Sequence, residues 1–244
     1  TLAIAGSHGK TTTTAMLIHL LKSVNLDPSF ILGADIKGQH TNAHAGKDQY
    51  FVIEADEYDN MFLGLKPKVS VITNIEYDHP DFFPTPLDYT WAFLNFLGKT
   101  EEDGVALLCG DDLGVRKLLT FLTFPEGQLK TFGFNPANDY QVMDYEAREG
   151  HQSFYLRLPG NDMAGPFTLH QPGKFNVSNA AAALAAAHLI GLDLNKLTDA
   201  LTTFAGTSRR FEQVCGNEKV QVFNDYGHHP SQLLQTIQGA RQSY

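Results

Sequence analysis

The residues best suited to chemistry lie near the start of the chain, where Gly6-Ser7-His8-Gly9-Lys10-Thr11 has the composition of a phosphate-binding loop. The loop follows an apolar run and precedes a segment whose apolar spacing suits a helix. In such a strand–turn–helix unit, the N–H groups of the turn and the positive end of the helix dipole converge on one anion. Lys10 would reach the β- and γ-phosphates of a nucleotide, and the Thr11 hydroxyl would bind the bridging Mg²⁺. The sequence predicts a nucleotide site made of Gly6, Ser7, His8, Gly9, Lys10, Thr11 and Thr12.

This phosphate loop (P-loop) is shorter than the common pattern G-x-x-x-x-G-K-[ST], because Ile4 stands where that pattern has its first glycine. A tight turn with a surface lysine is the alternative interpretation. The position between an apolar strand and a helix favours phosphate binding. Four consecutive threonines, residues 11–14, are poor helix interior, which indicates that function shaped this helix start.

A second group of polar residues follows the apolar run 50–53, which is typical of a strand covered on both faces. The run ends in four carboxylates within six residues, Glu54, Asp56, Glu57 and Asp59. For Asp56, Glu57 and Asp59 we expect an acidic surface turn. Glu54 stands at the carboxyl end of the strand, where open parallel sheets place their ligands.

A third group follows the next apolar strand, residues 69–72, and contains Asn74 and His79. Taken alone, a histidine before a proline is typical of a loop residue. Beside Glu54 on a neighbouring strand end, His79 suits a second divalent cation or acid–base work. Asn74 adds a neutral hydrogen-bonding group at the strand tip.

Two further motifs lie in the second half of the chain. Asn176 and Asn179 share one face of a helical first turn, so either they cap the helix or their amides contact a base or phosphate, and the residues alone leave both readings open. Arg209 and Arg210 precede an aromatic residue, and such a pair either clamps a phosphate or forms an exposed basic turn.

The elements that must position these residues alternate between short apolar strands and amphipathic helices, which predicts an α/β fold with a doubly wound, mostly parallel sheet. Helices are expected at 87–97, with Trp91 and Leu94 toward the core together with Phe93 and Leu97, and at 193–204. Alternating segments between 140 and 170 predict a small antiparallel β edge. A strand at 220–223 and a helix at 231–241 open a further unit.

Length and composition limit the functional classes. The 244 residues, 43% of them hydrophobic, suffice for one large domain or one domain plus a small one. A net charge of −9 argues against non-specific binding to nucleic acid or anionic membranes, and no apolar run is long enough for membrane insertion. Cys109 and Cys215 lack metal-ligand spacing and fit a reduced, cytoplasmic setting. Because Thr1 opens directly onto a strand, we expect a fragment of a longer protein.

Read together, the motifs resemble those of the Mur ligases, the ATP-dependent amide ligases of peptidoglycan assembly. The resemblance covers essentially the whole chain, and its motifs fall in the family's order: residues 6–14, 54–57, 73–79, 173–179, 209–211 and 225–230. The last motif and the histidine of the phosphate loop are most similar to the branch that joins L-alanine to UDP-N-acetylmuramate. The branch that attaches a recycled murein tripeptide is the second candidate, since residues 57–59 resemble it.

The resemblance implies roles for individual residues. Lys10 and Thr11 would serve the phosphates of ATP and the first Mg²⁺, and Glu54 and His79 would position the second cation. Further contacts to the nucleotide are implied for Asn176, Asn179, Arg210 and, at the ribose, Asp225. The family usually has histidine where Phe175 stands, which implies the loss of one polar contact near the adenine.

The resemblance also implies a mechanism and a domain plan. A substrate carboxylate takes the γ-phosphate of ATP, and an amine attacks the resulting acyl phosphate; Lys10, Arg210 and two cations stabilise the developing charge. Residues 1–211 would be the central ATP-binding domain and 212–244 the start of a C-terminal Rossmann-like domain, with the N-terminal UDP-sugar domain absent. Two other classes stay open, a P-loop switch without a covalent product and a structural α/β domain.

Overall fold

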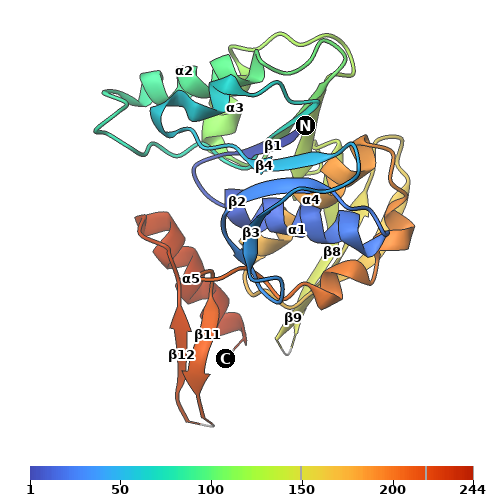
Figure 1. Cartoon of the computed structure of the whole chain (residues 1–244), viewed down its shortest axis with the longest axis vertical. Helices are drawn as coiled ribbons and strands as arrows, with labels where there is room; N and C mark the ends of the chain where they lie inside the picture. Colours follow the sequence, from blue (N-terminus) through green and yellow to red (C-terminus); the bar gives the residue numbers. More distant parts are fainter. Residues whose placement is uncertain (149, 218, 244) are drawn as a thin grey trace.

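A ten-stranded sheet forms the centre of the computed structural model, which describes residues 1–148, 150–217 and 219–243 (Figure 1). The strand order is β10-β9-β8-β7-β6-β5-β1-β4-β2-β3, and neighbouring strands from β2 to β8 are parallel. The strands are β1 (Leu2–Ala5), β2 (Ser29–Ile36), β3 (Thr41–His44), β4 (Phe51–Glu54), β5 (Val69–Ile72), β6 (Val105–Cys109), β7 (Leu129–Gly133), β8 (Tyr140–Arg148), β9 (His151–Arg157) and β10 (Met163–Leu169). The predicted mostly parallel sheet with an antiparallel edge is confirmed.

Helices cover both faces of the sheet, as a doubly wound fold requires (Figure 1). On one face, α1 (Lys10–Ser23) packs against α4 (Lys174–Leu189), whose buried segment 180–187 is alanine except for Leu184 and lets the two helices lie close. On the other face lie α2 (Pro86–Leu97) and α3 (Leu113–Leu119), with a separate apolar core. Among the described residues, no helix has both the length and the apolar character needed to cross a bilayer.

Two helical predictions are wrong in detail. The segment expected as one helix at 193–204 forms two short 3₁₀-helices, η2 (Leu194–Leu197) and η3 (Ala200–Thr203). Here the Thr203 hydroxyl and the His19 imidazole both bond to the carbonyl oxygen of Ala200 and so compete with helix continuation. In α2, Phe93 and Leu97 are buried as expected, but Trp91 is 49% exposed, because Tyr89 and Phe96 complete the buried stripe.

The sequence also missed three elements, which are β3, the 3₁₀-helix η1 (Tyr58–Gly64) and β11 (Glu212–Gly216). β11 pairs antiparallel with β12 (Gln221–Asn224) in a two-stranded sheet separate from the central one. Together with α5 (Pro230–Ser243), this hairpin projects from the main body (Figure 1). The chain between β12 and α5 returns to the phosphate loop, so this last unit contributes to the site.

Candidate active site

The phosphate loop connects β1 to α1 and leaves the helix N-terminus open. Gly9 is the N-cap residue, with a left-handed φ of 82°, and in the part of the chain that the structure describes no side chain caps α1. The first helical hydrogen bond runs from the Thr13 N–H to the Gly9 carbonyl, so the preceding N–H groups have no acceptor within the helix. No acidic residue lies in the first turn. The turn therefore keeps its donors for an anion.

The loop is held in shape by the end of β5. Asn74 accepts from the His8 N–H at 2.9 Å and donates to the His8 carbonyl at 2.8 Å, and the Thr73 hydroxyl donates to that carbonyl at 2.6 Å. A Cβ atom at Gly6 would lie 2.2 Å from the Thr73 hydroxyl oxygen, so only glycine fits there. Asn74, predicted as a site residue, thus uses both ends of its amide to fix the loop.

Ser7 also points away from the anion position. Its hydroxyl donates to the Glu76 carbonyl at 2.7 Å, accepts from the Glu76 N–H at 2.8 Å, and lies 2.8 Å from the Tyr89 hydroxyl. The side chain therefore joins the loop to the segment after β5. Any contact of Ser7 with a nucleotide would have to come from its backbone.

Glu57 is buried, which corrects the expectation of a surface position. Its side chain is fully buried and receives two hydrogen bonds from Lys10 Nζ, at 2.7 and 3.0 Å, and one from the Tyr89 hydroxyl at 3.1 Å. The reason is the turn after β4, where Asp59 and Asn60 have positive φ angles and η1 carries the chain back over the sheet. Asp59 is exposed, as expected.

Glu54 and Thr11, which the resemblance implies for two different cations, lie side by side. Thr11 Oγ1 donates to Glu54 Oε1 at 2.9 Å, and the Gly33 N–H donates to Glu54 Oε2 at 2.7 Å. The Arg210 guanidinium donates to the Thr11 hydroxyl oxygen at 3.3 Å. Carboxylate and hydroxyl oxygens are the hard ligands that Mg²⁺ prefers, so this donor set fits the ion.

A cavity of about 450 Å³ beside the loop is lined by Lys10, Thr11 and Glu54. His79 lies on the wall of this cavity. Its Nε2 atom is 3.8 Å from Glu57 Oε1, and its ring packs edge-on against Tyr58. The structure thus brings the predicted cation ligands to one cavity and adds Glu57 as a neighbour of His79.

A second cavity, of about 320 Å³, lies on the other side of the loop and is lined by Thr12, Asn176, Asn179, Arg210 and Asp225. Asn179 Nδ2 donates to Asn176 Oδ1 at 3.3 Å, and both residues are buried. The capping interpretation of this pair is wrong, because α4 begins at Lys174 with Gly173 as its N-cap. The Asn176 amide donates to the Pro172 carbonyl at 2.8 Å, and the Asn179 amide lies against Gly9 of the loop.

Two residues that line the second cavity, Gln171 and Thr207, carry buried side-chain oxygens without a partner. These atoms, Gln171 Oε1 and Thr207 Oγ1, lack a hydrogen bond among the described residues. Such unsatisfied atoms are uncommon in folded proteins and call for a ligand or water. Together with the open helix N-terminus, they fit a nucleotide with its phosphates at the loop and its base in this cavity.

Asp225 is the last of the predicted residues at this cavity. Its carboxylate accepts from the Phe211 N–H at 2.7 Å and from the Gly227 N–H at 2.8 Å. One bond comes from the residue just before β11 and the other from the turn after β12, so Asp225 ties these two segments together while lining the cavity. Arg210, near this turn, lies over the Tyr226 ring at 5.0 Å.

Cysteine chemistry does not compete for this site. Burial raises the pKa of the Cys109 thiol to about 11, so that thiol is protonated at neutral pH. Cys215 is exposed on β11 and lines neither cavity. A protonated thiol is a poor nucleophile, so the site is suited to binding and electrostatic stabilisation.

The site also contains residues that sequence reasoning missed, namely Glu57, Glu76, Gln171, Thr207 and Gln232. Glu57 belongs to the acidic run 54–59, but its burial depends on η1 and on Tyr89 from α2. Glu76 contacts His8 from the segment after β5, and Gln232 contacts it from α5. No spacing in the sequence signals either arrangement.

Comparison with known proteins identifies the family. Residues 4–187 match the family model for the Mur ligase middle domain. The chain belongs to the Mur ligase family.

The Mur ligases most similar to the chain include a UDP-N-acetylmuramate–L-alanine ligase of Syntrophomonas wolfei, 40% identical over 98% of this chain and 51% of that protein. A solved UDP-N-acetylmuramate–alanine ligase of Thermotoga maritima superposes with a TM-score of 0.83 at 28% identity, covering 100% of this chain and 54% of that one. A murein peptide ligase of Psychrobacter arcticus gives a TM-score of 0.74 at 26% identity, over 99% and 54%. The chain thus spans about half the length of these Mur ligases.

Proposed function

We propose that this Mur ligase chain is the nucleotide-binding part of an ATP-dependent amide ligase that joins L-alanine to UDP-N-acetylmuramate. The observation that carries the proposal is the open N-terminus of α1, with Lys10 and Arg210 beside it and a cavity on either side. One cavity holds the predicted cation ligands, and the other holds unpartnered polar atoms suited to a base. The named relatives support the choice of sugar acid and amino acid.

Each predicted residue receives a role under this proposal. The loop N–H groups, Lys10 and Arg210 hold the phosphates of the substrate ATP, and Asn176 and Asn179 contact the nucleotide. Asp225 approaches the ribose. Thr11, Glu54 and His79 would hold Mg²⁺, which supplies positive charge against the phosphate oxygens when bound.

The chemistry asks the protein for positioning and charge. The sugar-acid carboxylate oxygen forms a bond to the γ-phosphorus while the bond from ADP to that phosphorus breaks. The amine of alanine then attacks the carbonyl carbon, phosphate leaves, and one proton is lost from nitrogen. Both steps build negative charge that Lys10 and Arg210 can stabilise without a protein nucleophile.

We further propose residues 1–211 as the central ATP-binding domain and 212–244 as the start of the C-terminal Rossmann-like domain, with the UDP-sugar domain outside this chain. The separate β11–β12 sheet and the twofold greater length of the relatives support this division. Residues 1–244 alone should therefore lack ligase activity. Two cysteines without metal-ligand spacing support a cytoplasmic location.

The test is phosphate release by the intact protein with single omissions. Release should require ATP, UDP-N-acetylmuramate and L-alanine together, with amide product in equal amount. The likeness to a murein peptide ligase makes the tripeptide the second acceptor to try, and preference for it would transfer the proposal to that branch. Release that needs neither the sugar acid nor an amino acid would favour a P-loop switch. Absence of Mg·ATP binding in calorimetry would favour a structural domain.

A further inference from the structure

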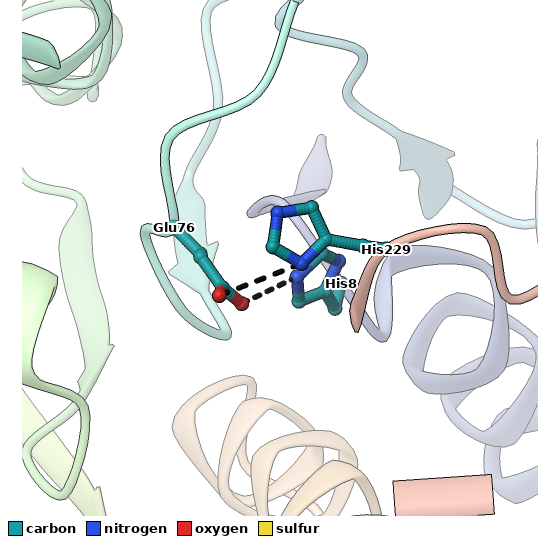
Figure 2. Close-up of side chains that lie close together, drawn as sticks. All are labelled: His8, Glu76 and His229. Atoms are coloured by element: carbon teal, nitrogen blue, oxygen red, sulfur yellow. Dashed lines mark hydrogen bonds and ion pairs between the residues drawn. The ribbon is translucent and has the colours of Figure 1, made fainter. Parts of the chain in front are cut away.

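Three side chains from distant parts of the chain meet beside the phosphate loop (Figure 2). His8 Nε2 lies 2.8 Å from Glu76 Oε2, and His229 Nδ1 lies 3.4 Å from Glu76 Oε1. His8 comes from the loop, Glu76 from the segment after β5, and His229 from the turn just before α5. The cluster therefore joins the loop to the C-terminal unit.

Gln232, in the first turn of α5, fixes the protonation of His8. Its Oε1 atom accepts from the N–H groups of His228 and His229, at 3.0 and 3.2 Å. Because the oxygen faces these two donors, the amide nitrogen must face His8, and it lies 2.8 Å from Nδ1. Nδ1 is then the acceptor, so the neutral ring carries its proton on Nε2 and donates it to Glu76.

Glu76 receives a further bond from α5. The Ser231 hydroxyl donates to Glu76 Oε2 at 2.6 Å and lies 2.9 Å from His229 Nδ1. Burial lowers the pKa of His8, which supports its neutral form. α5 therefore contacts the loop from two directions, through Gln232 directly and through Ser231 by way of Glu76.

The same cluster has the composition of a metal site, since the ligand atoms of His8, Glu76 and His229 lie within 4.8 Å of one another. The bonds of Gln232 argue against that use. A metal at His8 Nε2 would require the proton on Nδ1, where it would point at the Gln232 amide nitrogen, which has no lone pair to accept it. The hydrogen-bonded arrangement is thus the one that all the partners satisfy.

We propose that Gln232, His8 and Glu76 form a hydrogen-bonded relay that fastens the start of α5 to the phosphate loop, with Gln232 and Glu76 as positioning residues for nucleotide binding. The positioning role in this proposal rests on the proposed function, because it requires that the loop bind a nucleotide. The hydrogen bonds of the relay themselves form in the protein without a nucleotide. The loop geometry and the docking of the C-terminal unit are therefore coupled.

The first test reads the His8 tautomer in the intact protein without nucleotide, by nitrogen NMR of ¹⁵N-histidine-labelled protein, with the signal assigned by its loss in His8→Gln. The proton should be on Nε2. Gln232→Glu, which has the same shape but no N–H donor, should move a proton to Nδ1. A wild-type Nδ1–H tautomer, or a His8 signal unchanged in Gln232→Glu, would overturn the relay.

The second test compares Gln232→Leu with Gln238→Leu, a matched control on an exposed position of α5. Loss of the relay should raise the KM for ATP about tenfold, the effect of roughly one buried hydrogen bond, with a smaller change in kcat. Amide hydrogen exchange in the first turn of α5 should rise in Gln232→Leu and stay at the wild-type rate in the control. Unchanged exchange and KM in Gln232→Leu would contradict the relay.

A titration with Zn²⁺ alone addresses the metal alternative. If the relay is correct, Zn²⁺ should not bind stoichiometrically at this cluster. Stoichiometric binding that is abolished by Glu76→Gln and that shifts the His8 proton to Nδ1 would replace the relay by a metal site. Failure of the ligase proposal would appear separately. In that case wild-type protein would make no amide, while the tautomer and exchange results would stand.

Discussion

Lys10 of the phosphate loop forms a bidentate ion pair with Glu57, whose side chain is fully buried. The ammonium group also donates to the Gly6 carbonyl at 2.7 Å, so its position is fixed within the loop. A buried carboxylate that loses this partner would be left uncompensated. The pair therefore has a structural role that can be measured apart from the proposed role of Lys10 at the phosphates.

Glu57→Gln should lower the free energy of unfolding by about 3 kcal/mol, because the Lys10 charge then lies beside a neutral amide in a mostly buried site. Urea unfolding measures this loss. Asp59→Asn changes an exposed carboxylate in the same acidic run and should change stability by less than about 0.5 kcal/mol. Equal stability of Glu57→Gln and wild type would show that the pair contributes nothing net.

Lys10→Ala should abolish amide formation in the intact protein, since the transferred phosphoryl group loses its counter-charge. Because Glu57 would then be unpaired, the double variant Lys10→Ala/Glu57→Gln should recover stability without recovering turnover. Lys117→Ala, an exposed position on α3, is the control for the loss of one positive charge. Near-wild-type turnover by the Lys10 variants would remove the basis for the site assignment.

Glu54→Ala should raise the Mg²⁺ concentration needed for half-maximal turnover by about tenfold or more, because a carboxylate ligand is lost beside Thr11. His79→Ala should act in the same direction. A magnesium titration at saturating ATP measures both, with Asp59→Ala as the exposed carboxylate control. Identical magnesium curves for Glu54→Ala and wild type would exclude Glu54 as a ligand.

Stability should fall as pH drops below about 6.5. Burial lowers the pKa of His8, His19 and His188 from the ordinary value of 6.5, so the unfolded chain takes up protons before the folded one does. Their stabilising contribution is complete above pH 6.5 and is lost as pH falls toward the folded-state pKa values. Urea unfolding at pH 7.5 and 5.5 measures the loss.

His19→Gln should reduce this pH dependence, since one partly buried histidine with a lowered pKa is then absent. His40→Asn, at an exposed position with a positive φ that asparagine tolerates, should leave the pH dependence as it is in wild type. Ordinary carboxyl groups titrate near pH 4 and do not contribute in this range. Higher stability at pH 5.5 than at 7.5 would contradict the assignment.

The central sheet and the loop were predictable because their signals are local. A short apolar strand, a glycine turn and a helix start adjoin one another at residues 2–23, and the strand that ends at Glu54 carries its polar residue at the expected edge. The pairing of Asn176 with Asn179 follows from helical spacing alone. These features need no knowledge of distant contacts.

Other features depend on contacts between distant segments. Glu57 is buried only because η1 folds back and Tyr89 of α2 meets it, and neither event leaves a pattern in the acidic run. Gln232 contacts His8 across 224 positions of sequence. The second of the two 3₁₀-helices that replace the helix expected at 193–204 is held by His19 of α1, which bonds to the Ala200 carbonyl. Each of these features rests on a contact between distant segments that no local pattern signals.

The most direct test asks whether a carboxylate attacks the ATP held at this site. It measures the transfer of oxygen from the sugar acid to the released phosphate. UDP-N-acetylmuramate labelled with ¹⁸O in its carboxylate is turned over by the intact protein with ATP and L-alanine, and the released phosphate is weighed by mass spectrometry. Because a carboxylate oxygen bonds to the γ-phosphorus and leaves with it, we expect one ¹⁸O atom in each phosphate. Unlabelled phosphate formed together with the amide would contradict it.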